Sequence, residues 1–169
     1  LKLKEYYATM DLEYHALIID DEEDICELIE ISFLSIGIKS TKAYSVSDAI
    51  VALQNDEFDV CFTDLRLPDG DGFQILEYIQ RNTPELPVAM MTAHGNVESA
   101  IEALKLGAFD FISKPFEVTH LRKLATDAIK TKLSAENAES KEIMHGNSKA
   151  MQHIRNLIKR LAHSQAPDR

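Results

Sequence analysis

The sequence contains no tryptophan and only two cysteines, Cys26 and Cys61, among its 169 residues. Two cysteines cannot form the disulfide framework that supports a small secreted domain, so we interpret both as reduced, buried thiols. No apolar run reaches the roughly 18–20 residues that a membrane helix needs, and the first residues lack the apolar core of a signal peptide. We therefore expect a cytoplasmic protein without a membrane segment.

Positive charge is also scarce. The chain carries 18 Lys and Arg against 28 Asp and Glu, which gives a net charge of −10 and a pI near 5.0. A surface of this charge repels nucleic acid. With 45% hydrophobic and 27% charged residues, the composition is that of a globular protein, and the length fits one domain with a short annex.

Short apolar runs alternate with longer segments in which apolar residues recur at helical spacing. Strands are predicted at residues 15–20, 38–44, 58–63, 87–92 and 109–113. Helices are predicted at 25–37, from 47, from 73, at 96–106 and at 118–139, with a short C-terminal helix beyond 149. This alternation predicts an α/β protein with a doubly wound, five-stranded parallel sheet of the flavodoxin type and an extended fifth helix.

Polar side chains follow four of the predicted strands, at the edge where open α/β sheets bind ligands. They are Asp20 and Asp21 after the first strand, Asp64 after the third, Thr92 at the fourth and Lys114 after the fifth. Each alone reads as an ordinary strand-end residue, but together they form a set of oxygen ligands beside one amine. Because no His or Cys is among them, the set favours Mg²⁺ over zinc.

The chemistry open to such a set is narrow. A carboxylate beside Mg²⁺ can attack a phosphoryl group and form an aspartyl phosphate. The metal and Lys114 would then neutralise charge on the transferred oxygens, while the Thr92 hydroxyl binds one of them. We predict Asp64 as the nucleophile, because Gly70 and Gly72 in the loop after it allow positive φ and a tight turn.

Four segments, IIDDEED, FTDLRLPDGDG, MTAHG and GAFDFISKP, together resemble the receiver domain of two-component response regulators, over residues 14–137. The resemblance implies that Asp64 accepts the phosphoryl group and that Asp20 and Asp21 bind the metal, with the backbone carbonyl of Arg66 as a further ligand. It implies phosphoryl contacts for Thr92 and Lys114, a switch role for Thr92 with the aromatic Phe111, and a cis bond before Pro115.

The C-terminal segment HGNSKAMQHIRNLIKRLAHSQAP resembles the linker and first helix of the AAA+ ATPase in NtrC-type activators of sigma-54 RNA polymerase. The sequence contains no Walker A motif, so ATP hydrolysis, polymerase contact and DNA binding would belong to domains outside it. We accordingly predict an N-terminal extension (1–13), a receiver domain (14–132), a helical linker (133–148) and the start of the ATPase region (149–169).

The resemblance implies a regulatory phosphoacceptor rather than an enzyme. A sensor histidine kinase would phosphorylate Asp64, which draws Thr92 inward, lets Phe111 move and alters the face formed by residues 96–106, 109–113 and 118–139. We expect a homodimer through this face and the linker helix. The spacing of apolar residues along that helix places Leu121, Leu124 and Ala128 in the contact.

Two alternatives remain at this point. The domain could act as a docking module that needs no phosphate. It could also be a phosphohydrolase of the haloacid-dehalogenase kind, which uses an aspartyl phosphate. That class requires a second acid two residues after its nucleophile, and Arg66 occupies this position.

Overall fold

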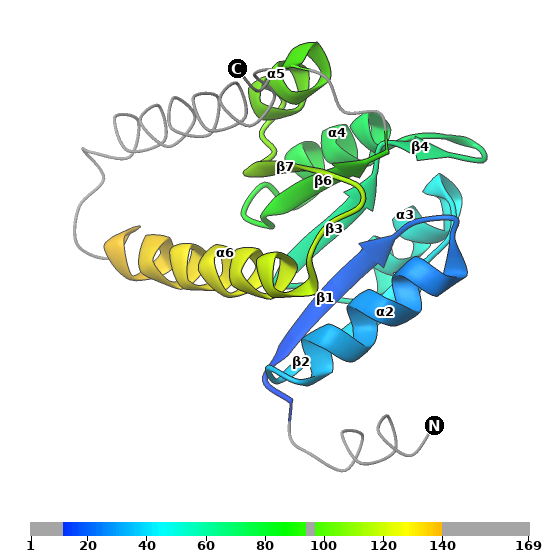
Figure 1. The fold of residues 1–169 in the computed structure, drawn as a ribbon. Helices are drawn as coiled ribbons and strands as arrows, with labels where there is room; N and C mark the ends of the chain where they lie inside the picture. Colours follow the sequence, from blue (N-terminus) through cyan, green and yellow to red (C-terminus); the bar gives the residue numbers. More distant parts are fainter. Residues whose placement is uncertain (1–11, 94–96, 140–169) are drawn as a thin grey trace, which may run out of the picture.

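Five strands form one parallel sheet at the centre of the computed structural model, which describes residues 12–93 and 97–139 (Figure 1). The strand order is β2-β1-β3-β6-β7, the order of flavodoxin-like folds. The bounds are β1 (Tyr14–Ile19), β2 (Ile38–Ala43), β3 (Val60–Asp64), β6 (Val88–Thr92) and β7 (Asp110–Ser113). All neighbouring strands pair in parallel, so the predicted fold class is confirmed.

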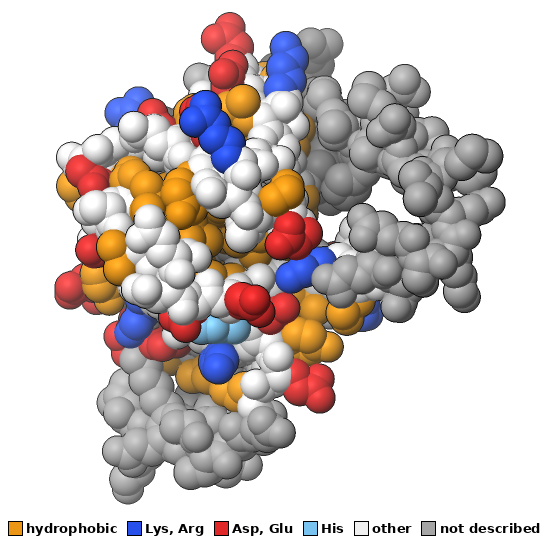
Figure 2. All heavy atoms as spheres, turned by 180° about the vertical axis from the view of Figure 1, so that it is seen from behind, with side chains coloured by type: hydrophobic (Ala, Val, Ile, Leu, Met, Phe, Trp, Pro, Cys, Tyr) orange, Lys and Arg blue, Asp and Glu red, His pale blue; other side chains and the backbone are white. Residues whose placement is uncertain are grey.

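Helices cover both faces of the sheet (Figure 1). On one face lie α2 (Glu23–Leu34) and α6 (Val118–Glu139), and on the other lie α3 (Val46–Asn55), α4 (Gly72–Asn82) and α5 (Val97–Lys105). Seen from behind, hydrophobic side chains show between the polar ones over α3 and α4 (Figure 2). Val51 of α3 is 53% exposed. Among the described residues, no helix combines the length and apolarity required to cross a membrane.

Burial on both faces explains why the central strands are nearly continuous apolar runs. Every residue of β3 and β6 is buried. Successive side chains of a strand point to opposite faces of the sheet. Met90 packs with α4 and α5, and its neighbour Met91 packs with α2 and α6. Each strand therefore holds its last residues rigidly at the carboxyl edge of the sheet.

The segment after β3 differs from the prediction of a simple turn-rich loop. It forms a two-stranded antiparallel hairpin of β4 (Arg66–Leu67) and β5 (Gly70–Asp71). The proposed use of positive φ at Gly70 and Gly72 is wrong, because among the described residues positive φ occurs at Gly37 and Gly107. Gly72 is instead required by close approach: a Cβ there would lie 2.5 Å from the Asp64 carbonyl oxygen.

Three residues of α6 have a different role from the predicted one. Leu121, Leu124 and Ala128 are 0%, 6% and 4% exposed and pack into the core shared with α2 and the sheet. The prediction that they form a dimer contact is corrected, because their side chains already face this chain's own interior. Their spacing is that of a helix packed against a sheet.

Most of the predicted N-terminal extension (1–13), part of the predicted linker (133–148) and the whole of 149–169 lie outside the described residues. In the part of the chain that the structure describes, α6 continues without interruption past residue 132 as far as Glu139. The predicted boundary between receiver and linker thus falls inside one helix.

Candidate functional site

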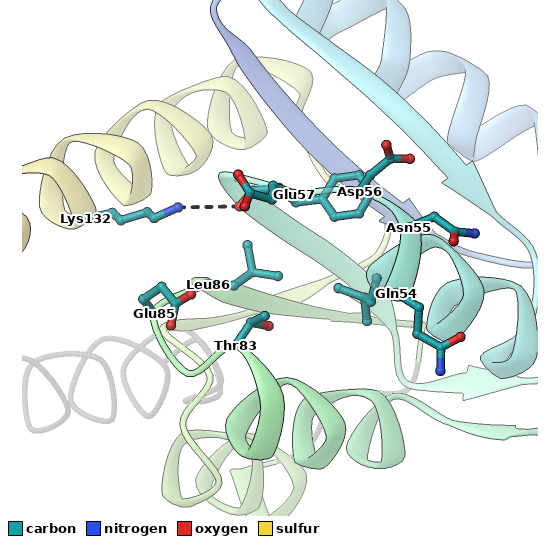
Figure 3. A pocket seen from close by; sticks show the side chains of 10 residues that line it. Gln54, Asn55, Asp56, Glu57, Thr83, Glu85, Leu86 and Lys132 are labelled. Atoms are coloured by element: carbon teal, nitrogen blue, oxygen red, sulfur yellow. Dashed lines mark hydrogen bonds between the residues drawn. The ribbon is translucent and has the colours of Figure 1, made fainter.

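A cavity of about 540 Å³ opens at the amino ends of β3 and β6 (Figure 3). Its lining combines the acidic side chains of Asp56, Glu57 and Glu85 with Lys132, whose ammonium group donates to the Phe58 carbonyl oxygen at 3.4 Å. None of the residues predicted to carry function lines this cavity. The predicted site lies at the opposite edge of the sheet.

The polar residues predicted from the strand ends meet at the carboxyl edge. Asp64 and Thr92 are the last residues of β3 and β6, and Asp20 and Lys114 directly follow β1 and β7. These four strands are consecutive neighbours in the sheet, which brings their ends together. A cavity of about 240 Å³ opens there, lined by Asp21, Glu22, Asp64, Arg66, Thr92, Ala93 and Lys114.

Three carboxylates at this edge are close enough to share one cation. Asp20, Asp21 and Asp64 each offer an oxygen atom, and these atoms lie within 4.8 Å of one another. Asp20 and Asp64 are buried and Asp21 is exposed, so the group is fixed on its inner side and open to solvent on its outer side. Hard oxygen donors with space beside them for water fit Mg²⁺.

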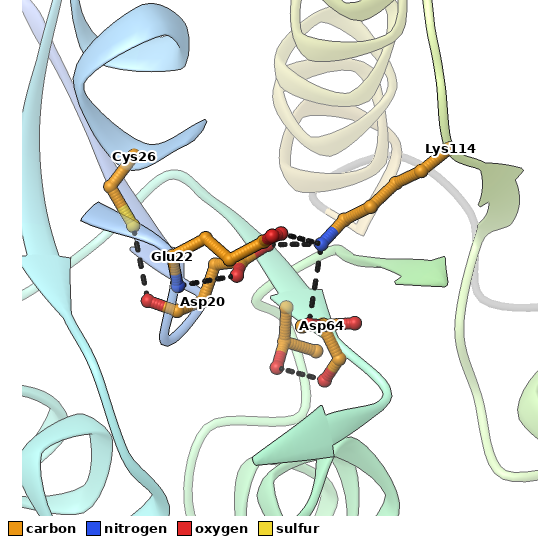
Figure 4. A network of polar contacts seen from close by, with 6 residues as sticks. Asp20, Glu22, Cys26, Asp64 and Lys114 are labelled. Atoms are coloured by element: carbon orange, nitrogen blue, oxygen red, sulfur yellow. Dashed lines mark hydrogen bonds and ion pairs between the residues drawn. The ribbon is translucent and has the colours of Figure 1, made fainter. Parts of the chain in front are cut away.

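Lys114 reaches into the same group from the opposite side (Figure 4). Its Nζ lies 2.5 Å from Asp20 Oδ2, 3.3 Å from Asp64 Oδ2 and 3.4 Å from Glu22 Oε2. Burial by itself would lower the pKa of Lys114, but hydrogen bonding and the charges of Asp20 and Asp64 outweigh it and raise that pKa. The ammonium group therefore stays charged and balances part of the negative charge.

At Asp64 the surroundings disfavour the charged form, whereas at Lys114 they favour it. Burial, and then the nearby charge of Asp20, raise the pKa of Asp64 above its ordinary value of 3.8, although Lys114 opposes this. The carboxylate form is thus under electrostatic strain in the absence of a metal. A divalent cation would relieve that strain.

This strain predicts a pH dependence of stability in EDTA. Because folded Asp64 binds its proton more tightly than the unfolded chain does, its contribution to stability is full below pH 3.8 and is lost as pH rises through the raised pKa. Urea unfolding of wild type and Asp64→Asn from about pH 4 to about pH 7 should show the variant gaining relative stability as pH rises. Parallel pH profiles would contradict this assignment, and Mg²⁺ should remove the difference.

One further acidic residue, Glu22, lies at this site and was not among the predicted ones. Glu22 donates its backbone N–H to Asp20 Oδ1 at 2.9 Å, and its carboxylate faces Lys114. Its membership of the acidic run 20–24 was the available signal. Cys26 supports the same turn by donating to the Asp20 carbonyl oxygen, and burial raises the pKa of its thiol to about 12, so it remains protonated.

Thr92 and Phe111 occupy neighbouring strands on the same side of the sheet. Thr92 is buried at the end of β6, and the Lys114 N–H donates to its carbonyl oxygen at 2.8 Å. Phe111 pairs in register with Met90 and packs in the core under α5. Because side chains alternate between faces, Thr92 shares the face of Met90 and Phe111.

Two features implied by the resemblance concern the backbone. The Lys114–Pro115 peptide bond is cis, as the resemblance implies. Arg66 lines the site cavity from β4 while the residue as a whole is exposed. The role of its backbone carbonyl as a metal ligand stays a prediction.

Comparison with known proteins agrees with this arrangement. A family model described as the response regulator receiver domain matches residues 16–126. The response regulator protein PilR of Pseudomonas aeruginosa is 45% identical over 153 residues, which cover 90% of this chain and 34% of PilR. The DNA-binding transcriptional regulator NtrC of Proteus hauseri is 34% identical over 154 residues, covering 87% of this chain and 33% of NtrC.

Solved structures show the same likeness. The beryllofluoride-activated NtrC4 receiver domain dimer matches with a TM-score of 0.67 and 30% identity, over 70% of this chain and 98% of that one. NtrX from Brucella abortus matches with a TM-score of 0.72 and 32% identity, over 76% of this chain and 29% of that one. The chain spans about a third of the length of the curated relatives named here. By its sequence match and its fold, it belongs to the response regulator receiver domain family.

Proposed function

We propose that this chain is a phosphoacceptor module in which Asp64 receives a phosphoryl group from the phosphohistidine of a sensor kinase. The observation that carries the proposal is the meeting of Asp20, Asp21 and Asp64 within 4.8 Å, with the Lys114 ammonium group among them. A purely structural strand edge would have no reason to concentrate buried carboxylates against a single amine.

In the proposed transfer, a carboxylate oxygen of Asp64 attacks phosphorus. A P–O bond forms while the P–N bond to the donor imidazole breaks, and the electron pair of that bond leaves with the imidazole. Lys114 turns from Asp64 toward the incoming oxygens, and the Thr92 hydroxyl donates to another. Asp20, Asp21, Asp64 and the Arg66 carbonyl would hold Mg²⁺, which when bound supplies positive charge to the phosphoryl oxygens.

The alternatives have less support. A phosphohydrolase of the haloacid-dehalogenase kind would need an acid two residues after Asp64, where the exposed Arg66 stands on β4. A docking module that needs no phosphate would not require Lys114 to be held on two buried carboxylates. We therefore assign a regulatory role and not an enzyme's turnover of a substrate.

We further propose that phosphorylation acts through the face formed by α5, β7 and α6, with Thr92 and Phe111 as the switch. The NtrC4 receiver, 30% identical to this chain, is described as a dimer in its beryllofluoride-activated form. Among the described residues in and beside α5, β7 and α6, the large apolar side chains that are exposed are Leu106 and Leu133, at 37% and 42%. They replace the buried residues of α6 as the expected contact.

The role of the longer protein to which this chain would belong is inferred from its relatives. PilR and NtrC are regulators about three times the length of the matched part. We propose that this receiver, followed by the linker from 133 and the region from 149, controls a sigma-54-dependent activator. Contacts with polymerase and DNA would then be made by other domains of that protein.

Sedimentation velocity tests this proposal. With Mg²⁺ and beryllofluoride, which mimics the phosphoryl group, we expect the mass distribution of the wild-type chain to change between monomer and dimer. Asp64→Asn should show no change under the same conditions. An unchanged wild-type distribution, with beryllofluoride shown to be bound by ¹⁹F NMR, would contradict control of the dimer by phosphate.

A further inference from the structure

We propose that Asp69 is a positioning residue for the cation site, because its carboxylate ties the hairpin that carries Arg66 to the amino end of α3. The inference rests on the function proposed above and deepens it.

The contact is made by both carboxylate oxygens. Asp69 Oδ1 accepts from the Val46 N–H at 2.7 Å, and Oδ2 accepts from the Ser47 N–H at 3.0 Å. These are the first two residues of α3, whose N–H groups have no partner within the helix. The next N–H, of Asp48, is already taken by the Ser45 hydroxyl. Asp69 thus completes the cap of α3 from a different part of the chain.

The charge of Asp69 makes this a strong tether. A carboxylate that accepts two N–H groups at the positive end of a helix forms charge-assisted hydrogen bonds. The bonds to Val46 and Ser47 lower the pKa of Asp69, so the carboxylate is ionised near neutral pH. Asparagine at the same position can offer only one acceptor oxygen and no charge.

The hairpin has little stability of its own. Its two strands have two residues each, and an isolated two-stranded hairpin is marginally stable in water. Its base is fixed, because the Leu65 N–H donates to the Met91 carbonyl oxygen and the Gly72 N–H to that of Leu65. Asp71 is fixed by reciprocal bonds with Gln74. Asp69 adds the contact at the tip.

Close packing at the tip agrees with a fixed position. A Cβ on Gly70 would lie 1.9 Å from Gln74 Oε1 and 3.1 Å from Val46 Cγ2. The tip is therefore held between α3 and α4. Arg66 lies in the partner strand, where it pairs with Asp71 and borders the site cavity.

Asp69 would act on the cation site through the Arg66 carbonyl, which is proposed above as a metal ligand. The carboxylates of Asp20 and Asp64 are placed by β1 and β3, but the Arg66 carbonyl is placed by the hairpin. Loss of the tether would let this carbonyl fluctuate while the carboxylates stay in place. Groups that orient metal ligands typically change metal affinity by about 10- to 100-fold, and we expect the lower end of that range.

Isothermal titration of Mg²⁺ into the unphosphorylated chain tests the inference. We expect Asp69→Ala to raise the Mg²⁺ dissociation constant about 10-fold and Asp69→Asn to raise it less. Asp48→Asn is the matched control, because it removes the same charge from the first turn of α3 without touching the hairpin. Its dissociation constant should stay within about twofold of wild type.

Hydrogen exchange locates the effect. The amides of Arg66, Leu67, Asp69 and Gly70 should exchange faster in Asp69→Ala, and those of β1 and β3 should not. Wild-type affinity in Asp69→Ala, or equal weakening in Asp48→Asn, would overturn the positioning role. If Asp69→Ala does not fold, Asp69→Asn decides the question by the same two measurements.

The outcomes also separate this inference from the proposed function. A wild-type chain that binds neither Mg²⁺ nor beryllofluoride would contradict the proposed function itself. A wild-type chain that binds both, with Asp69→Ala indistinguishable from it, would leave the phosphoacceptor role intact and overturn only the role of Asp69.

Discussion

Phosphoryl incorporation from acetyl phosphate in Mg²⁺ is expected to fall by roughly 10³-fold or more when Asp64 is replaced with asparagine. The carboxylate is the atom group that forms the new bond to phosphorus, and an amide oxygen is a far weaker nucleophile. Lys114 and the remaining carboxylates would still be in place. The variant therefore loses the nucleophile but keeps the cavity around it. Intact-protein mass spectrometry after a timed incubation measures the incorporation.

Asp59 provides the matched control for this experiment. It directly precedes β3 whereas Asp64 ends that strand, and it accepts from the His15 N–H at 2.9 Å. Asp59→Asn changes the same residue type at the other end of the same strand, and its labelling rate should match wild type. Persistent labelling of Asp64→Asn at the wild-type rate would show that another group accepts the phosphoryl.

Replacing Lys114 with methionine is expected to lower both stability and transfer. Asp20 is fully buried and Lys114 is the cation in contact with it, so removing the amine leaves a buried charge without its partner. Breaking such a pair costs about 3 kcal/mol of unfolding free energy. The rate of phosphoryl transfer should fall by about 100-fold, because one positive group at the transferred oxygens is lost.

Mg²⁺ gives this prediction a sharper form. The variant's site carries one positive charge fewer, so it should bind Mg²⁺ more tightly and recover more stability from it than wild type does. Urea unfolding with and without Mg²⁺ measures both effects. The control is Lys132→Met, whose partner Asp59 is 3.7 Å away and partly exposed, and which should cost about 1 kcal/mol or less with no response to Mg²⁺. If Lys114→Met and Lys132→Met lost the same unfolding free energy, this would contradict the claim that Lys114 balances a buried charge.

The carboxyl-edge site could be predicted from sequence because its residues stand at strand ends. The runs around Ile19, Phe62 and Met91 are nearly all apolar, and each ends in a polar residue that the parallel topology brings to one edge. Fold and site therefore depend on the same pattern. Strand ends were predicted to within one or two residues, which was sufficient because the first polar residue marks each edge.

The hairpin of β4 and β5 could not be predicted in the same way. Two-residue strands have no periodicity, and the tether from Asp69 to Val46 joins residues 23 positions apart. Glu22 was hidden for a related reason, since it is one of several acids in a row and its orientation toward Lys114 depends on the turn after β1. The tether arises from tertiary structure and leaves no local signal, and the acidic run 20–24 does not show which of its side chains faces Lys114.

The misassigned residues of α6 show a limit of helical periodicity. Apolar residues at Leu121, Leu124 and Ala128 repeat as a dimer seam would, but the same repeat marks the face of a helix that packs on its own sheet. The apolar repeat identifies which face of the helix is buried, but it does not identify the surface against which that face packs. Here the partner is the core formed with α2 and the central strands.

Chemical trapping can identify the residue that accepts the phosphoryl group. Borohydride reduces an aspartyl phosphate to homoserine, so peptide sequencing by mass spectrometry after labelling and reduction identifies the acceptor. We expect homoserine at position 64 when Mg²⁺ is present and unmodified aspartate there when EDTA replaces it. Homoserine at another position, or the same yield at position 64 in EDTA, would contradict a cation site built from Asp20, Asp21 and Asp64.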